Sequence, residues 1–427
     1  MTLKSIVHPG GPEHSPAARV QSGFDVRLIA FYLPQFHPTE ENDKRWGRGF
    51  TEWHRVVQAK PFFRGHYQPH LPADLGFYDL RLGETREAQA EMARTCGIYG
   101  FCYYHYWFNG KRILQRPFQE VLASGTPDLP FCLCWANDNW TRVWEGRPHE
   151  VFEEQRYSDE DDRAHIRSLI PAFRDPRYIR IQGKPLFLIY RTEKFPNPRR
   201  TSEIWREEAR KCGLDDLYLA RVESFIGGVD PRQIGFDAAV EFAPDWRNMG
   251  RLRLFHGWER PLAKLGLLPE AHSTLHICDY EFMMKRMLQK PWPDYDFFRG
   301  VTPGFDNTAR RANTAAIFVN SGPSEYEHWL RQAVEDTRSR YQGDRRLVFV
   351  NAWNEWGEGN HLEPDQKYGR AFLEATVRAL SESSLHVNSS QEASRQASSL
   401  KRTYWQGNRL FQQFGNLIRE VRYGRSR

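Results

Sequence analysis

The chain has 427 residues, 40% of them hydrophobic and 27% charged, the composition of an ordinary globular protein that can bury a sizeable core. Its formal net charge is +6, but acidic and basic residues are mixed along most of the chain, which argues against a nucleic-acid-binding protein with a single basic face. Six cysteines without a CxxC pattern indicate free thiols in a reducing cytosol, and no run of about 18 apolar residues predicts a membrane-spanning helix.

The first residues predict no element of the fold. Residues 1–25 are rich in Pro, Gly, Ser and His, and they contain no apolar segment of the signal-peptide type. We expect a disordered leader there.

Eight apolar runs then predict strands: Arg27–Leu33, Ile98–Tyr104, Pro130–Ala136, Pro185–Tyr190, Leu217–Val222, Phe236–Phe242, Arg299–Phe305 and Leu347–Trp353. Helical patterns separate most of them: Leu80–Cys96, Lys111–Ser124, Asp159–Phe173, Thr201–Cys212, Asp279–Gln289 and Ser324–Tyr341. This alternation predicts an α/β fold, a (β/α)8 barrel of the TIM type with long βα loops over residues 26–380. A doubly wound open sheet is the alternative, but no GxGxxG follows the first strand.

The end of the chain has a different composition. Residues 381–400 are rich in Ser and Gln and predict a linker. Residues 401–427 predict a basic amphipathic helix, which either contacts the inner-membrane surface or a partner, or docks on the barrel or frays.

The stretch after the last predicted strand carries the strongest chemical pattern. Trp353-Asn354-Glu355-Trp356-Gly357-Glu358-Gly359 places two carboxylates three residues apart, so one helical turn points both to the same side. Glycoside cleavage needs a carboxyl group as proton donor and a second as base or nucleophile, and indole rings stack on sugar faces. The alternative interpretation is a solvated acidic turn with both tryptophans packed in the core.

The other strand ends are also polar or aromatic. Residues just past the C-terminal ends of barrel strands converge on one face, so we expect a carbohydrate site there. The predicted catalytic residues are Glu355 and Glu358. The predicted substrate-binding residues are Tyr32, Gln35, His37, Glu52, Trp53, Tyr104, His105, Trp107, Trp135, Asn137, Asp138, Tyr190, Arg191, Glu223, Asp306, Asn307, Trp353, Asn354 and Trp356. For His105 a hydrogen-bonded structural histidine is the alternative, and for Asn137-Asp138 a helix cap.

Several long motifs in one order carry a family resemblance. They are AFYLPQFHPTEEND, WGRGFTEW, GFCYYHYWFNGKRILQRP, CWANDNWTR, GKPLFLIYR and VNAWNEWGEGNHLEPD, over roughly residues 27–378. The chain resembles the WbsX-type glycosyltransferase family, which is similar to glycoside hydrolase family 99, the endo-α-mannosidases and endo-α-mannanases.

The resemblance implies a mechanism for the two glutamates. Glu355 would be the base that activates the 2-hydroxyl of the sugar itself, which attacks the anomeric carbon to give a 1,2-anhydro sugar. Glu358 would be the general acid and then the base for the acceptor, so that the anomeric configuration is retained. The resemblance also implies surface-polysaccharide (O-antigen or lipopolysaccharide) biosynthesis in the bacterial cytoplasm, with an oligosaccharide or polysaccharide as substrate.

Two other functions remain as alternatives: a sugar-nucleotide-dependent transferase acting on a lipid-linked glycan, and a non-catalytic carbohydrate-binding protein. Asp294-Tyr295-Asp296 has the DxD spacing of metal-dependent transferases, but no predicted strand precedes it. The histidines show no HxH or HExxH spacing. We therefore expect no metal and no cofactor, and no nucleic-acid partner.

Overall fold

The computed structural model describes residues 24–142, 147–250, 259–267, 274–311 and 314–381. Most of the predicted leader, the Ser-rich linker after Ser381 and the predicted amphipathic helix at 401–427 lie outside these residues. The description below concerns the unit that ends at Leu380. Among the described residues, no helix is both long and apolar enough to cross a membrane.

Eight parallel strands close into a barrel in the order β1-β14-β12-β10-β9-β8-β4-β2, with β2 pairing back onto β1. Their bounds are β1 Arg27–Tyr32, β2 Ile98–Phe108, β4 Phe131–Trp135, β8 Lys184–Ile189, β9 Tyr218–Glu223, β10 Ala238–Glu241, β12 Asp296–Val301 and β14 Leu347–Val350. Each of the eight predicted strands has its counterpart, so the predicted (β/α)8 barrel is confirmed.

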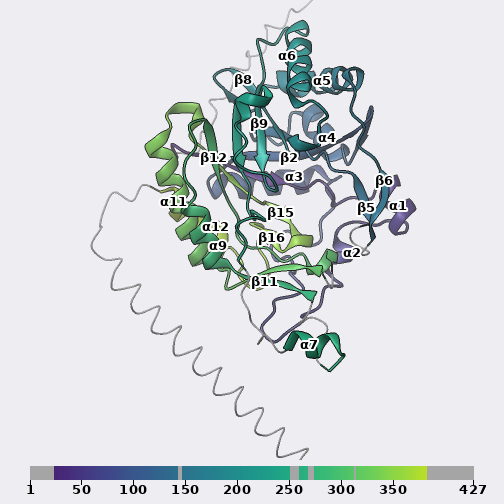
Figure 1. Cartoon of the computed structure of the whole chain (residues 1–427), viewed down its shortest axis with the longest axis vertical. Coiled ribbons are helices and arrows are strands. Elements are labelled where there is room, and N and C mark those ends of the chain that lie inside the picture. Colours follow the sequence, from purple (N-terminus) through teal and green to yellow (C-terminus); the bar gives the residue numbers. More distant parts are fainter. Residues whose placement is uncertain (1–23, 143–146, 251–258, 268–273, 312–313, 382–427) are drawn as a thin grey trace, which may run out of the picture. The chain divides into compact units, whose positions relative to one another are not determined.

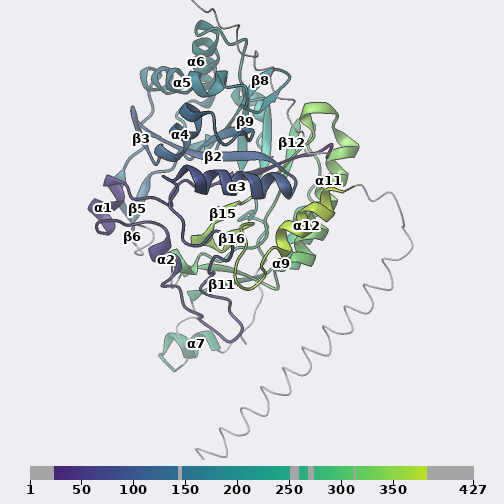
Figure 2. The same ribbon diagram turned by 180° about the vertical axis from the view of Figure 1, so that it is seen from behind.

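Helices alternate with the strands and surround the barrel (Figures 1 and 2). The longer helices are α3 Gly83–Thr95, α4 Arg116–Ser124, α5 Asp159–Arg174, α6 Pro198–Lys211, α9 Tyr280–Leu288, α11 Pro323–Arg340 and α12 Ala371–Leu380. The shorter helices are α1 Glu40–Trp46, α2 Trp53–Val56, α7 Glu259–Lys264 and α10 Thr308–Arg311, and the 3-10 turns are η2 Thr192–Lys194, η3 Pro231–Ile234, η5 Gly343–Arg345 and η6 Trp356–Glu358. Helix α11 packs against both α12 and α9 along one side of the barrel.

Several short strands lie outside the barrel. Two of them pair antiparallel with barrel strands, β3 Lys111–Ile113 with β2 and β7 Arg180–Ile181 with β8. Six others form three two-stranded sheets: β5 Trp140–Arg142 with β6 Arg147–Glu153, β11 His276–Asp279 with β13 Ala316–Val319, and β15 Asn354–Glu355 with β16 Asn360–His361.

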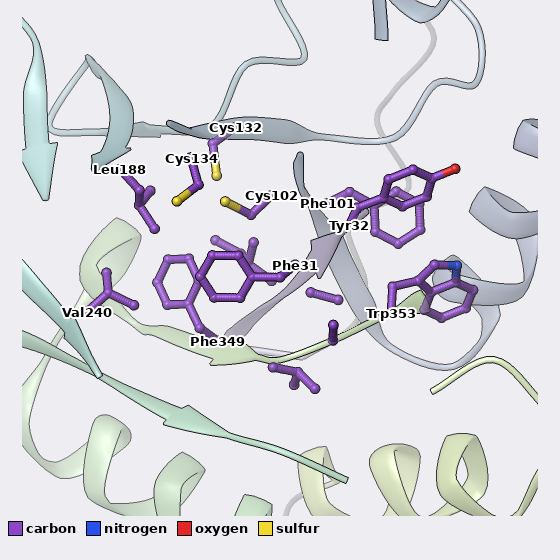
Figure 3. Close-up of a cluster of buried hydrophobic side chains, with 14 of the residues drawn as sticks. Phe31, Tyr32, Phe101, Cys102, Cys132, Cys134, Leu188, Val240, Phe349 and Trp353 are labelled. Atoms are coloured by element: carbon purple, nitrogen blue, oxygen red, sulfur yellow. The ribbon is translucent and has the colours of Figure 1, made fainter. Parts of the chain in front are cut away.

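The barrel core follows from strand alternation. Successive residues of a strand point to opposite faces, and the buried apolar residues of β1 and its neighbours divide accordingly. Figure 3 shows Phe31 and Phe349 with Cys134, Leu188 and Val240, whereas Tyr32, Phe101 and Trp353 gather in a second group. Cys102, Cys132 and Cys134 are buried free thiols, as the sequence indicates.

Several predicted boundaries were wrong. The second strand runs on to Phe108 instead of ending at Tyr104, and the last ends at Val350 instead of Trp353. The predicted helix at Lys111–Ser124 begins as strand β3, because Asn109 and Gly110 both have positive φ and form a tight hairpin turn between β2 and β3. The seventh strand runs over Asp296–Val301, earlier than the predicted Arg299–Phe305, because Phe297 and Phe298 are already buried. Asp306 and Asn307 therefore lie several residues beyond the strand end.

Candidate functional site

The segment after β14 folds into a hairpin that presents both glutamates. Asn354 pairs with His361 and Glu355 with Asn360, and the 3-10 turn η6 lies between the two short strands. Gly359 ends the turn with φ +53°, in the left-handed region that favours glycine. In a 3-10 helix residues three apart eclipse each other, and the side chains of Glu355 and Glu358 do point to the same side, as the spacing predicts, since both contact Arg310.

Arg310 joins three carboxylates from two loops. Its Nε donates to Glu52 Oε1 at 2.6 Å and its Nη2 to Glu355 Oε2 at 2.7 Å, and its Nη1 lies 2.8 Å from Glu358 Oε1. Glu52 comes from the long loop after β1 and Arg310 from α10, which follows β12. These four side chains, the Arg310 cluster, all follow the C-terminal ends of barrel strands, where TIM barrels place their active sites.

The Arg310 cluster is unevenly buried. The side chains of Glu52 and Glu355 are 0% and 8% exposed, whereas that of Glu358 is 26% exposed. Burial, together with the charges of Glu358 and Glu52, raises the pKa of Glu355 to about 8, and Arg310 opposes the shift. Glu355 is therefore mostly protonated at neutral pH, and it is a much stronger base than an ordinary glutamate once it ionises.

A buried hydrogen-bond network around Glu363 and Asn354 holds the hairpin in place. Glu363 Oε2 accepts from Trp356 Nε1 and from Tyr78 Oη, both at 2.7 Å, and Glu363 Oε1 accepts from Gln89 Nε2 at 2.6 Å. The Asn354 side chain accepts from the backbone N–H of Leu33 and donates to its carbonyl. These bonds tie the hairpin to the end of β1 and to α3.

The charges of the glutamates act on three nearby tyrosines. Burial, Tyr190 and Glu355 raise the pKa of the half-buried Tyr104, and burial and Glu355 raise that of Tyr106. Burial and the charge of Glu358 raise the pKa of Tyr190, whose ring meets that of Tyr104 edge to face at 6.4 Å. Tyr104 and Tyr190, both predicted site residues, thus lie with the glutamates.

A second polar group follows β4 and β8. The Asn137 side chain accepts from the N–H of Arg191 and donates to its carbonyl, and Arg191 pairs with Asp138 at 3.1 Å. The Arg191 guanidinium lies over the ring of Phe225, 4.1 Å from its centroid. Phe225 stacks with Trp246 and meets Tyr190 edge to face. The structure therefore brings Asn137, Asp138, Arg191 and Tyr190 together.

Asp306 and Asn307 hold loops near the glutamates. Asp306 accepts from Gln68 Nε2 and Thr308, lies 2.6 Å from His66 Nε2, and its N–H donates to the carbonyl of Glu358. The Asn307 side chain accepts from the N–H of Ala316.

Four predicted site residues instead face the surrounding helices. Tyr32 donates to Gln89 on α3. Near α5, His105 Nε2 lies 2.9 Å from His165 Nε2, and Trp107 donates to Asp161. Trp135 packs against His165 and Trp205. Alternation explains this placement, because Tyr104 points toward Phe31 in the barrel and its neighbour His105 must then point outward.

The remaining predicted residues are buried around the strand ends. Trp53 packs on Trp356, and the carbonyl of Gln35 accepts from the N–H of Glu52. Burial lowers the pKa of His37 to about 4, so its imidazole is neutral. Glu223 pairs with Arg221 at 2.7 Å.

The two tryptophans of the hairpin are packed as core. Trp353 and Trp356 are 0% and 1% exposed, and Trp356 stacks on His361 with ring centroids 3.7 Å apart. A ring without exposed surface cannot stack on a sugar unless its neighbours move. For these two rings the structure therefore agrees with the alternative interpretation of the sequence, in which both tryptophans pack in the core.

Sequence reasoning missed Arg310, His66, His70 and His361. The signal for Arg310 was indirect: three carboxylates gathered at strand ends require a cation, and Thr308-Ala309-Arg310-Arg311 follows the polar pair Asp306-Asn307.

His70, His361 and Asp365 form a group whose ligand atoms lie within 4.8 Å of one another and could hold a metal ion. Asp294 and Asp296 of the DxD motif are bound instead to Arg232 and Tyr218.

Comparisons with known proteins agree with the fold and with the sequence motifs. The model of the family described as Glycosyltransferase WbsX matches residues 28–376. Two proteins named Uncharacterized protein WxcX, from two strains of Xanthomonas campestris pv. campestris, are each 44% identical over 353 residues, which is 83% of this chain and 49% of theirs. The chain thus spans about half the length of these relatives.

Among solved structures, one described as a glycoside hydrolase-like protein matches with a TM-score of 0.51 and 14% identity, covering 87% of this chain and 98% of that one. At this identity the likeness shows the fold alone. A glycoside hydrolase family 99 endo-α-mannosidase from Bacteroides thetaiotaomicron matches with a TM-score of 0.49 and 14% identity, over 84% of this chain and 97% of that one.

Proposed function

The chain belongs to the WbsX glycosyltransferase family, and from that premise we propose that it is a carbohydrate-active enzyme in which Glu355 and Glu358 cleave or transfer α-linked, mannose-like units with retention of configuration. The observation that carries this proposal is the Arg310 cluster, which holds both carboxylates on one guanidinium at the C-terminal end of the barrel.

In the proposed first step Glu355 is the base. It takes the proton of the sugar 2-hydroxyl, O2 forms a bond to the anomeric carbon, the bond to the leaving oxygen breaks, and Glu358 gives that oxygen a proton. A sugar hydroxyl is a weak acid, so a base whose pKa lies near 8 is better suited than an ordinary glutamate. The larger exposure of Glu358 is consistent with contact with the departing and arriving groups.

In the second step the roles reverse. Glu358 takes a proton from water or from an acceptor hydroxyl, whose oxygen attacks the anomeric carbon. The bond from O2 to that carbon breaks, and Glu355 returns the proton to O2. Two displacements at one carbon retain its configuration, and the acceptor decides between hydrolysis and transfer.

Sugar contacts in this proposal come from the half-buried and exposed aromatic residues and not from the buried hairpin tryptophans. Phe225 is 39% exposed, and it adjoins Tyr190, Arg191 and Trp246. Aromatic faces stack on sugar rings, while Asp138, at 39% side-chain exposure, can accept hydroxyl hydrogen bonds. His105, Trp107, Tyr32 and Trp135 would act on substrate only indirectly, by fixing the strands to the helices.

The proposed cellular role is the assembly of a surface polysaccharide such as O-antigen or lipopolysaccharide, in the cytoplasm or at the inner membrane. It rests on the family resemblance. The family is described as a glycosyltransferase family, and this description favours a second candidate function, a transferase that takes its sugar from a nucleotide donor.

The test is turnover of a panel of α-mannosyl oligosaccharides and of the host polysaccharide, with and without sugar nucleotides. Wild type is compared with Glu355→Gln and Glu358→Gln, and with Glu327→Gln as a matched control, because Glu327 pairs with Arg331 and Arg378 on the outer helices. We expect nucleotide-independent turnover that both site variants lose and the control keeps. Nucleotide-dependent transfer that survives both site variants would place the chemistry elsewhere.

A further inference from the structure

We propose that His70, His361 and Asp365 bind a divalent transition-metal ion of the Zn²⁺ class, which clamps the loop after β1 to the hairpin that carries Glu355 and Glu358. The three ligand atoms lie within 4.8 Å of one another, and His70 Nδ1 is 2.9 Å from His361 Nε2. Two imidazoles and one carboxylate form a ligand set that suits Zn²⁺ and leaves a position for water.

The tautomer of His361 favours metal binding. Its Nδ1 lies 2.9 Å from the backbone carbonyl of Glu363, and a carbonyl can only accept, so Nδ1 carries the proton. Nε2 then offers its lone pair toward His70. A metal-binding histidine typically donates its other ring N–H to a carbonyl or carboxylate in this way.

Backbone bonds and ring contacts fix the three ligands in place. Residues 71–73 pair with residues 364–366, through Gln366 N–H to the carbonyl of Leu71 and Ala73 N–H to that of Pro364, both at 2.9 Å. Asp365 Oδ1 accepts from the backbone N–H groups of Lys367 and Tyr368 in its own turn, and the Tyr67 hydroxyl also lies against this carboxylate. The ring of Tyr67 packs on His70, and that of Trp356 on His361.

Holding an ion requires an adjustment of the side chains. Ligands bound at about 2.0 to 2.2 Å in a tetrahedral site lie about 3.3 to 3.6 Å apart, so the two imidazole nitrogens, now 2.9 Å apart, must separate slightly and the most widely spaced ligand atoms, which lie within 4.8 Å, must approach by up to about 1 Å. The His70 imidazole is half-buried and the other two ligands are nearly fully buried. Lys367, which lies over the rings of Tyr67 and Tyr368, and Asp306, which pairs with His66, are the nearby charges that act on His70.

The location indicates a positioning role for the ion. His361 stacks on Trp356, which lies between Glu355 and Glu358 in the sequence, and His70 Cε1 lies 3.2 Å from where a Cβ on Gly359 would be. His70 comes from the loop that also carries Glu52, His361 from the hairpin that carries the other two carboxylates, and Asp365 from the segment that follows this hairpin. No HxH or HExxH spacing could reveal this group, because two of its ligands are 291 residues apart.

Metal binding by the purified full-length chain tests the proposal without any activity assay. The chain is stripped with a chelator and titrated with Co²⁺, followed by its visible d–d absorption, and with Zn²⁺, followed by elemental analysis. We expect one ion per chain, and X-ray absorption of the Zn²⁺ form should show two imidazole ligands. His70→Ala and Asp365→Asn should weaken binding by more than the roughly 10- to 100-fold that loss of an outer-shell partner causes.

His276→Ala is the matched control, because His276 is an exposed histidine on β11 outside the group, and it should bind as wild type does. Thermal melts of each stripped variant establish that it folds. Absence of binding by wild type, an absorption spectrum without two imidazoles, or equal affinity in folded His70→Ala would overturn the proposal.

Discussion

Replacing Arg310 by methionine should destabilise the fold strongly at alkaline pH and much less at acidic pH. Arg310 is the cation shared by Glu52, Glu355 and Glu358, and its side chain is 9% exposed. Methionine fills much of the same volume but leaves two buried carboxylates without a counter-charge.

The magnitude follows from burial. Removing one partner of a buried ion pair typically costs about 3 to 5 kcal/mol, because the other charge remains desolvated. A Coulomb estimate gives about 4 kcal/mol for one pair at 4 Å with an effective dielectric constant of about 20. Protonation limits the share of Glu355 to about 1.4 kcal/mol at pH 9, one unit above its pKa of about 8, so the loss of about 3 to 5 kcal/mol that we expect there comes mainly from the broken pair with Glu52.

The pH dependence has a definite sign. Loss of the guanidinium raises the folded-state pKa of Glu355 further above the unfolded value, which is 4.5 for a glutamate, because Arg310 is the group that opposes the shift. A group with a raised folded-state pKa contributes stability that is complete below its unfolded pKa and is lost as the pH rises through the folded pKa. The part of the deficit that comes from Glu355 should therefore be close to zero up to about pH 8, where Glu355 is protonated in both folded proteins, and grow by about 1.4 kcal/mol per pH unit above it.

Denaturant unfolding of wild type and variant at pH 5 and pH 9 measures this deficit. Arg378→Met is the control, because its guanidinium is 52% exposed and its pairing with Glu327 should contribute at most about 1 kcal/mol. Equal losses for the two variants at pH 9, or a loss at Arg310 that does not change with pH, would refute the reasoning.

Three further predictions concern the hairpin and the chemistry. In Gly357→Ala the new Cβ would lie 2.0 Å from Glu52 Oε1 and 2.8 Å from Arg310 Nε, so turnover should fall about 100-fold, whereas Gly83→Ala should match wild type in the same assay. Tyr78→Phe removes a hydrogen bond to the buried Glu363 carboxylate and should lower the unfolding free energy by about 1 to 3 kcal/mol, against a near-neutral Tyr99→Phe. NMR should show the first-formed product anomer with the configuration of the substrate; an inverted first product would exclude the two-step path.

The alternation of strand and helix patterns in the sequence was enough to predict the barrel, because the barrel strands are short apolar runs that are buried on both faces. Asn109-Gly110 was a readable hairpin signal, and using it would have extended β2 and shortened the next helix. The period-two alternation of β2 would likewise have placed His105 and Trp107 on the face opposite Tyr104.

The composition of the site was less predictable than its position. Spacing places Glu355 and Glu358 on one side of a turn, but no local pattern connects them with Glu52 or Arg310, which lie 303 and 45 residues before Glu355 and meet it only through barrel closure. The burial of Trp353 and Trp356 also depends on partners that are distant in the sequence, Phe101 and Trp53 among them. The aromatic content of a segment therefore does not show whether its rings are exposed for stacking on a sugar or packed in the hydrophobic core.

The most direct test of the central claim is the pH dependence of single-turnover cleavage by Glu358→Gln. An α-mannosyl substrate with a dinitrophenolate leaving group needs no proton donor, so in this variant Glu355 is the titrating group of the pair. If Glu355 is the base, the rate of dinitrophenolate release should rise about tenfold per pH unit and level off as Glu355 ionises. The plateau should begin below the pKa of about 8 that Glu355 has in wild type, because this variant lacks the charge of Glu358, which helps to raise that pKa. A rate that falls as the pH rises through 8 would identify Glu355 as a proton donor and contradict the account.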